Sequence, residues 1–322
     1  MIGLAEVGAG LRQAGLTARG LAAWAGTARL AALPARLDAL LSRPITPAGA
    51  ALAWLVGGAE LARGQLRLAE DVIDGLIAEG LAARAGDRLR ARVAIVPLGP
   101  SLLVCDRLDA PVERDAVCWP DDSSHHLATA IPPGRRARWL DLGCGSAFAA
   151  LARPALAAAI TGVELNPRAA RYAAIGAGLS GVALQVAEGD LAVSAGSAEL
   201  VTCNPPIPEP VSEPAWAGHL AAELWRRADP GLFDRLWPAL RRAVAPGGEV
   251  VVHAASDALE PALAAADGER VIVRYTPDGV RGFAVAWWRP DAAPRLVVSQ
   301  RALTADRPHL EPADRDAALL GA

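Results

Sequence analysis

From residue 138 onward, short apolar runs alternate with longer segments in which apolar residues recur every three or four positions. Runs of the first kind are typical of buried strands, and segments of the second kind are typical of amphipathic helices. Their alternation favours an α/β fold with a doubly wound sheet, whose last two strands form an antiparallel hairpin. The predicted strands are 139–142, 160–164, 182–186, 200–203, 249–253, 271–275 and 283–288, and the predicted helices are 147–157, 167–177, 231–244 and 257–265.

The N-terminal part of the chain has a mainly helical pattern. It predicts short amphipathic helices over 4–41, further helices over 46–55 and 66–79, and a hairpin made of 81–84 and 93–98. Helix, helix and hairpin in this order are typical of a winged helix. We therefore expect an N-terminal helical, winged-helix-like domain over 1–107, a linker and closing segment over 108–136, an α/β domain over 137–290 and a C-terminal tail over 291–322.

Charge argues against nucleic acid as the favoured partner. The formal net charge is -3 and the isoelectric point about 6.0. The helix that would read DNA in a winged helix is acidic, and an acidic helix repels a phosphate backbone. A role in covering a substrate, docking a partner or forming a homodimer fits this domain better. The acidic residues of that helix are Glu70, Asp71, Asp74 and Glu79.

Composition excludes several other classes. Apolar residues make up 52% of the chain, and no stretch reaches the roughly 18 uncharged apolar residues of a membrane span. The N-terminus, with Glu6, lacks a signal-peptide pattern, so we expect a cytoplasmic protein with no membrane partner. No CxxC pair or zinc-ligand spacing occurs, and we expect reduced, packed thiols and no metal. The cysteines are Cys105, Cys118, Cys144 and Cys203.

A capped helix is predicted within the linker, where Asp121-Asp122-Ser123-Ser124 precedes a more apolar stretch. The adjacent His125 and His126 raise the question of a metal site. Neighbours on a helix point about 100° apart and cannot readily chelate one ion, so we interpret both as solvated residues near the cap.

Chemically active residues follow the first three predicted strands. Gly143 and Gly145 allow a tight turn and a close approach of a ligand to the backbone, and Asp141 precedes them, well placed for an ammonium group. Phe148 stands where a nicotinamide-binding fingerprint requires a third glycine, so that cofactor is disfavoured. Glu164, at the end of the second strand, is placed for two ribose hydroxyls, although it could instead cap the next helix.

Two residues after the third strand complete this series. Asp190 could accept a hydrogen bond from an adenine amino group, and Leu191 could pack on the ring. After the fourth strand comes Asn204-Pro205-Pro206. The Asn204 side-chain oxygen and the Pro205 carbonyl could hold both N–H groups of a planar amine, which would direct nitrogen electron density at an electrophile. The alternative is that this sequence only terminates a strand.

With these motifs, residues 137–290 resemble a class I S-adenosylmethionine-dependent methyltransferase of the Asn-Pro-Pro-aromatic branch, which includes release-factor glutamine, adenine-N6 and rRNA guanine-N2 methyltransferases. The resemblance implies a seven-stranded Rossmann-like sheet and S-adenosyl-L-methionine as cofactor. It also implies that Asn204, Pro205, Pro206 and Ile207 are catalytic, and that the cofactor is bound by Asp141, Gly143, Cys144, Gly145, Glu164, Leu165, Asn166, Asp190, Leu191 and Asn204, with Ser123 and Ser124 closing over it.

Two positions depart from that family's pattern. Ile207 replaces the usual aromatic residue, which makes stacking of a purine less favourable, and Ala147 replaces a common third glycine. The sequence thus favours an N-methyltransferase that acts on an amide or amine, with a glutamine-like protein side chain as the leading acceptor. A small-molecule methyltransferase of secondary metabolism and a nucleic-acid base N-methyltransferase are the alternatives, and a non-catalytic binding module is a third.

Overall fold

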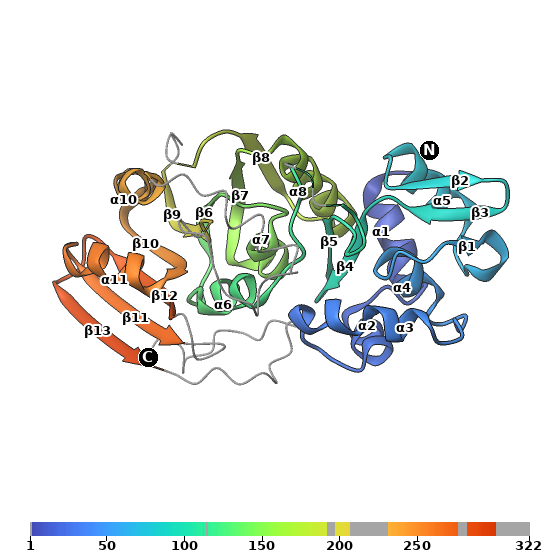
Figure 1. The fold of residues 1–322 in the computed structure, drawn as a ribbon. Helices are drawn as coiled ribbons and strands as arrows, with labels where there is room; N and C mark the ends of the chain where they lie inside the picture. The colour runs from blue at the N-terminus through green and yellow to red at the C-terminus, as the bar shows by residue number, and fades with distance from the viewer. Residues whose placement is uncertain are drawn as a thin grey trace.

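The computed structural model describes residues 2–111, 113, 115–191, 197–206, 231–275 and 282–300. Its centre is an eight-stranded sheet with the order β13-β11-β12-β10-β9-β6-β7-β8 (Figure 1). The strands from β8 to β10 are parallel, and β12 runs antiparallel to both of its neighbours, β10 and β11. The strands are β6 (Arg136–Leu142), β7 (Ala157–Glu164), β8 (Leu184–Glu188), β9 (Ala198–Cys203), β10 (Val244–Ala255), β11 (Glu269–Tyr275), β12 (Phe283–Arg289) and β13 (Arg295–Gln300).

The α/β prediction and the terminal hairpin are confirmed, and the sheet has one strand more than the seven expected. The additional strand is β13, which lies in the expected C-terminal tail and pairs in parallel with β11. Its apolar residues Leu296 and Val298 are 44% and 42% exposed. The short apolar run Leu296-Val297-Val298 is present in the sequence, but it lies beyond the expected terminal hairpin, within the expected tail.

Helices cover both faces of the sheet, and alternate side chains of each strand enter different cores. On β6, Trp139 joins the core beneath α6 (Asp122–Ala130), α7 (Phe148–Ala152) and α8 (Pro167–Ser180). Leu140 and Leu142 join the opposite core beneath α10 (Leu232–Ala243) and α11 (Ser256–Ala264). The 3-10 helix η4 (Pro154–Leu156) leads from α7 into β7.

The N-terminal region is mainly helical, as expected. Helix α5 precedes a hairpin of β2 and β3, and β1 pairs with β3 on its other side. The elements are α1 (Leu4–Gln13), α2 (Ala18–Ala25), η1 (Leu30–Ala32), η2 (Pro34–Arg36), α3 (Leu37–Leu41), α4 (Ala50–Leu55), β1 (Leu61–Ala62), η3 (Arg63–Gln65), α5 (Glu70–Ala78), β2 (Ala82–Ala85) and β3 (Arg88–Ala91). No helix of the described residues has the length and apolar content that crossing a bilayer requires.

The expected hairpin partner, 93–98, was wrong. These residues form β4 (Ala94–Leu98), which pairs with β5 (Ser101–Cys105) in a separate two-stranded ribbon. Strand β3 takes the expected place because Leu89 and Ala91 face the core while Arg88 and Arg90 face solvent. Every residue of β4 and β5 is buried, which explains the continuous apolar run in the sequence.

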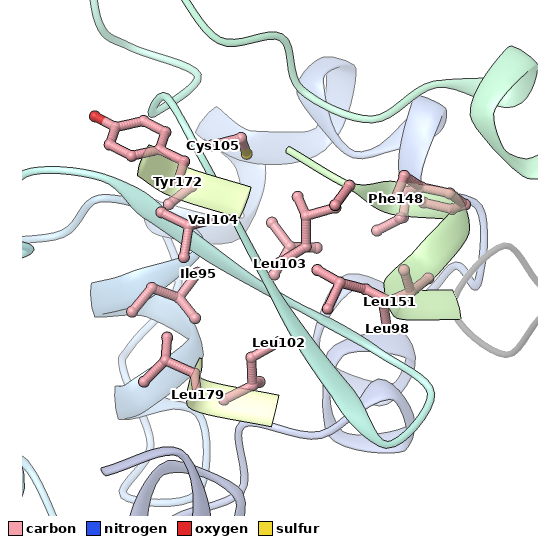
Figure 2. Packing of buried hydrophobic residues seen from close by; sticks show 14 of the residues in the cluster. Ile95, Leu98, Leu102, Leu103, Val104, Cys105, Phe148, Leu151, Tyr172 and Leu179 are labelled. Carbon is pink, nitrogen blue, oxygen red and sulfur yellow. The ribbon is translucent and has the colours of Figure 1, made fainter. Parts of the chain in front are cut away.

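The β4–β5 ribbon joins the N-terminal region to the central sheet. Figure 2 shows Leu102, Leu103 and Val104 among side chains of α7 and α8, including Leu151 and Leu179. The amide of Leu102 donates to the Ser180 hydroxyl at 2.8 Å, which ties the ribbon to the end of α8. One hydrophobic core therefore extends from the first helices to one face of the sheet.

Helix α6 has the expected cap but not the expected histidine environment. The Asp121 side chain accepts hydrogen bonds from the amides of Ser123 and Ser124. His125 and His126, which we expected to be solvated, are only 2% and 5% exposed. The reason is tertiary, because α6 packs between α7 and the strands β10 and β12, so its whole second half is enclosed.

Candidate functional site

The predicted site residues lie at one edge of the sheet, where the parallel strands β8, β7, β6 and β9 end. Leu142 at the end of β6 pairs with Cys203 at the end of β9, so the glycine turn and Asn204 leave the sheet side by side. Glu164 at the end of β7 pairs with Glu188 at the end of β8. Carboxyl ends of parallel strands at such an edge are where open α/β sheets bind ligands.

The glycine turn is a left-handed backbone segment that leaves open space above it. Gly143, Gly145 and Ala147 have φ angles of 66°, 54° and 63°. The amides of Gly143 and Cys144 both donate to the Val163 carbonyl, at 2.8 and 3.1 Å, which fixes the turn to β7. A Cβ on Gly145 would meet nothing within 4 Å, whereas one on Gly143 would lie 3.2 Å from Leu191. The turn therefore has room for a ligand at Gly145.

Glu164 links the glycine turn to the start of α8. Its carboxylate accepts the amide of Gly145 at 2.7 Å and that of Asn166 at 2.8 Å. Asn166 itself is the N-cap of α8, and its side chain also donates to the Asp115 carbonyl. Glu164 thus organises the turn instead of capping the helix directly, and Asn166 has the capping role.

Asp141 is a buried carboxyl group with a hydrogen-bonding chain behind it. It is 3% exposed and accepts the Thr202 hydroxyl at 2.5 Å, while Trp139 donates its indole N–H to Thr202 at 2.7 Å. Burial raises the pKa of Asp141 to about 7, opposed by the bond from Thr202. Sequence reasoning missed Thr202 and Trp139, since only the β6–β9 pairing places Asp141 opposite Thr202.

The Asn204 side chain is half-buried and held at both ends of its amide. Its nitrogen donates to the Ser123 hydroxyl at 2.9 Å, and its oxygen lies 2.9 Å from Nδ1 of His253 on β10. Sequence reasoning joined Ser123 to this site but missed His253. Pro205 is buried and Pro206 is exposed, and Ile207, the fourth predicted catalytic residue, lies outside the described residues.

The remaining predicted residues differ in their surroundings. Cys144 is 8% exposed and packs against Gly162, where a Cβ would lie 2.7 Å from its sulfur, and burial raises its thiol pKa well above the usual value. Only the Cys144 backbone is therefore suited to ligand contact. Leu165, which follows Glu164 at the end of β7, is 69% exposed. Asp190 lies 3.9 Å from Arg235 of α10, and the amide of Ser124 takes part in the α6 cap.

Comparison with known proteins finds a similarity to a family in the middle of the chain. Residues 118–231 match the family model of the methyltransferase small domain. This range contains the glycine turn, Glu164, Asp190 and Asn204. No curated protein matches the chain.

Several solved structures are similar to parts of the chain at low identity. A predicted O-methyltransferase from Agrobacterium tumefaciens is 20% identical, with 56% of this chain and 85% of that one covered and a TM-score of 0.40. The Thermus thermophilus 16S rRNA N2 G1207 methyltransferase is 19% identical, with 63% and 46% covered and a TM-score of 0.42. A putative class I S-adenosylmethionine-dependent methyltransferase from Listeria monocytogenes is 15% identical, with 66% and 72% covered and a TM-score of 0.42.

Proposed function

We propose that this S-adenosylmethionine-dependent methyltransferase transfers its methyl group to an amide or amine nitrogen, with a glutamine-like protein side chain as the favoured acceptor, and that it belongs to the Asn-Pro-Pro branch. The methyltransferase small domain at residues 118–231 supports the enzyme class and the cofactor. The observation that carries the choice of nitrogen is the Asn204 amide, anchored on two sides beside the glycine turn.

The residues of the sheet edge fit the cofactor. The Asp141 carboxylate would take the ammonium group of the methionine portion, and the open space at Gly145 admits that portion close to the backbone. Each oxygen of Glu164 accepts one amide in the described structure, and a carboxylate has further acceptor positions for two ribose hydroxyls. The exposed Leu165, with Asp190 and Leu191, would bind the adenine. When bound, the cofactor supplies an electrophilic methyl group on a sulfonium.

The role of this protein toward the methyl acceptor is to position its nitrogen. An amide or aromatic amine is a poor nucleophile because its lone pair is delocalised. The Asn204 oxygen has a second lone pair besides the one facing His253, and the Pro205 carbonyl follows it in the chain. Two such acceptors fix both N–H groups of the acceptor nitrogen and orient its electron density, so catalysis needs alignment and no strong base.

Substitution of Asn204 tests the proposal. In Asn204→Ala we expect methyl transfer from labelled cofactor to fall about 100-fold or more, with the dissociation constant for S-adenosylmethionine within about threefold of wild type. Calorimetry measures the affinity, and transfer of label into fractionated lysate measures turnover. Label in the protein fraction supports a protein side chain as the methyl acceptor. Label in RNA, DNA or metabolites contradicts it and identifies the class of the true acceptor. Undiminished turnover in Asn204→Ala contradicts the catalytic role.

For the N-terminal region we propose a winged-helix-like domain that docks the acceptor or a second copy of the chain, in a protein of the cytoplasm. The support is the order of α5, β2 and β3, with β1 beside β3. Helix α5 presents carboxylates, and two arginines, Arg63 and Arg84, already pair with its Glu70. Such a surface favours a protein partner over a phosphate backbone.

A further inference from the structure

A continuous chain of hydrogen bonds runs through the interior behind Asn204. It begins at Asp121, the cap of α6, whose Oδ1 lies 2.6 Å from the Ser123 hydroxyl. Ser123 contacts the Asn204 nitrogen at 2.9 Å, and the Asn204 oxygen contacts His253 Nδ1 at 2.9 Å. Nε2 of His253 makes a short contact with the Tyr275 hydroxyl. These five residues come from α6, the end of β9, β10 and β11.

The donors and acceptors fix the direction of this chain. Asp121 Oδ1 already accepts the amides of Ser123 and Ser124, at 3.0 and 3.3 Å, so this oxygen carries no proton. The Ser123 hydroxyl must therefore donate to Asp121 and accept from Asn204, which turns the amide nitrogen of Asn204 toward α6. The Asn204 oxygen then faces His253, whose Nδ1 must carry the proton, and Tyr275 must donate to Nε2.

The far end of the chain is enclosed by rings and strands. His253 and Tyr275 are each 3% exposed. Phe283 stacks on both of them, at centroid distances of 5.7 and 5.9 Å, and His126 meets Tyr275 edge-on at 4.8 Å. Burial, with a smaller effect of His126, lowers the pKa of His253 to about 3, so the ring stays neutral at physiological pH. A neutral imidazole has one donor and one acceptor, as this chain requires.

We infer that His253 and Tyr275 are positioning residues for the proposed methyl transfer. They keep the side-chain oxygen of Asn204, and not its nitrogen, directed at an N–H group of the methyl acceptor. If the amide rotated by 180°, its own N–H group would face the N–H group of the methyl acceptor, and the two donors would repel each other. Ser123 donates to Asp121 and therefore holds only the nitrogen end of the Asn204 amide. Without the His253 contact the oxygen end loses its donor, and the amide is held at one end only.

The inference rests on the proposed role of Asn204, and a double-mutant cycle separates the two. In His253→Leu we expect kcat to fall about 10- to 100-fold, with the dissociation constant for S-adenosylmethionine within about threefold of wild type. In an Asn204→Ala background the same substitution should change kcat less than about twofold, because the residue through which it acts is gone. His253→Asn, which can still place an N–H near the Nδ1 position, should recover most of kcat.

Two further variants guard against a folding defect. Tyr275→Phe keeps the ring and removes only the hydroxyl, and it should lower kcat by about three- to tenfold. Phe283→Leu disturbs the same packing without touching the chain of hydrogen bonds, and it should lower Tm while kcat stays within about twofold. Equal kcat losses for His253→Leu in both backgrounds would overturn the inference and leave the proposed function standing.

The histidine tautomer gives a readout independent of activity. In the full chain labelled with ¹⁵N-histidine, NMR at neutral pH should show His253, assigned by its loss in His253→Asn, with its proton on Nδ1. A proton on Nε2 would reverse the whole chain and overturn the inference, whatever the kinetics show. If Asn204→Ala turns over normally, the proposed function fails at Asn204, and the tautomer still decides whether the amide is held as described.

Discussion

At the scale of single residues, burial gives the carboxyl group of Asp141 an unusually high pKa. Its ordinary pKa is 3.8, and burial brings it to about 7. Since the folded protein holds this proton to higher pH than the unfolded chain does, the contribution of Asp141 to stability falls as pH rises from about 4 to 7. The ammonium group of a bound cofactor would favour the charged carboxylate of Asp141 over its protonated form.

This linkage predicts that cofactor affinity rises with pH. Because S-adenosylmethionine would bind the deprotonated Asp141, its dissociation constant should be about tenfold larger at pH 6 than at pH 8, as measured by calorimetry. Asp141→Asn should bind more weakly and lose most of this dependence. An unchanged pH slope in Asp141→Asn would show that another group is responsible.

At the scale of elements, the β6–α7 connection departs from the usual backbone conformations. Three alternate residues, Gly143, Gly145 and Ala147, are left-handed, and Ala147 is the only non-glycine with positive φ in the described residues. The left-handed conformation of Ala147 explains why a glycine is common at this position in the family that the sequence resembles. The turn is thus shaped by its backbone, with the side chain of Glu164 as its main support.

Gly145 offers a matched test of whether the open space binds the cofactor. Gly145→Ala should cost about 1 kcal/mol of stability because of its positive φ, and it should weaken S-adenosylmethionine binding about tenfold or more. Gly181→Ala at the end of α8 is the control, since its φ is 67° and a Cβ there also meets nothing within 4 Å. It should lower Tm similarly and leave binding unchanged. Equal affinities of the two variants would exclude the glycine turn from the binding site.

At the scale of the whole molecule, the N-terminal region packs onto the α/β part through the β4–β5 ribbon and through two further contacts. Helix α1 lies so close to α8 that a Cβ on Gly8 would be 1.8 Å from the Leu179 carbonyl oxygen, and Arg12 donates to that oxygen at 3.1 Å. Arg29 forms an ion pair with Asp122, and Trp119 donates to the Leu30 carbonyl at 3.0 Å. The second contact lies next to Asp121 and Ser123, at the start of the chain of hydrogen bonds that reaches Asn204.

The close α1–α8 contact predicts a strong effect of one methyl group. Gly8→Ala should destabilise the protein by about 2 kcal/mol, because backbone must move to admit the Cβ, and thermal unfolding should show a Tm lower by several degrees. Gly64→Ala, with no atom within 4 Å of its Cβ, should leave Tm within about one degree. An unchanged Tm in Gly8→Ala would mean that α1 does not pack on α8 as described.

Local pattern was sufficient for most of the architecture. The alternation of apolar runs and helical segments predicted the seven strands from β6 to β12, the helices between them and the capped helix α6. It failed at β13, at the 93–98 run and at His125 and His126. Strand β13 pairs with β11, and α6 packs on β10 and β12, so their environments come from elements distant in sequence, which local pattern does not contain. The 93–98 run was assigned to the wrong partner, since it pairs with the strand that directly follows it.

By itself, the sequence determined which chemical groups lie at the ends of the parallel strands, because apolar runs, glycines and the Asn-Pro-Pro segment are local signals. These groups are an acid near the end of β6 with a glycine turn after it, an acid as the last residue of β7, and an amide after β9. Only the tertiary structure decided what stands behind those groups. Thr202 donates a hydrogen bond to Asp141, 61 positions away, and the Asn204 amide contacts Ser123 and His253, which are 81 and 49 positions away. Strand pairing and the packing of α6 bring these residues together. Directional hydrogen bonds form only where the fold brings donor and acceptor within about 3 Å.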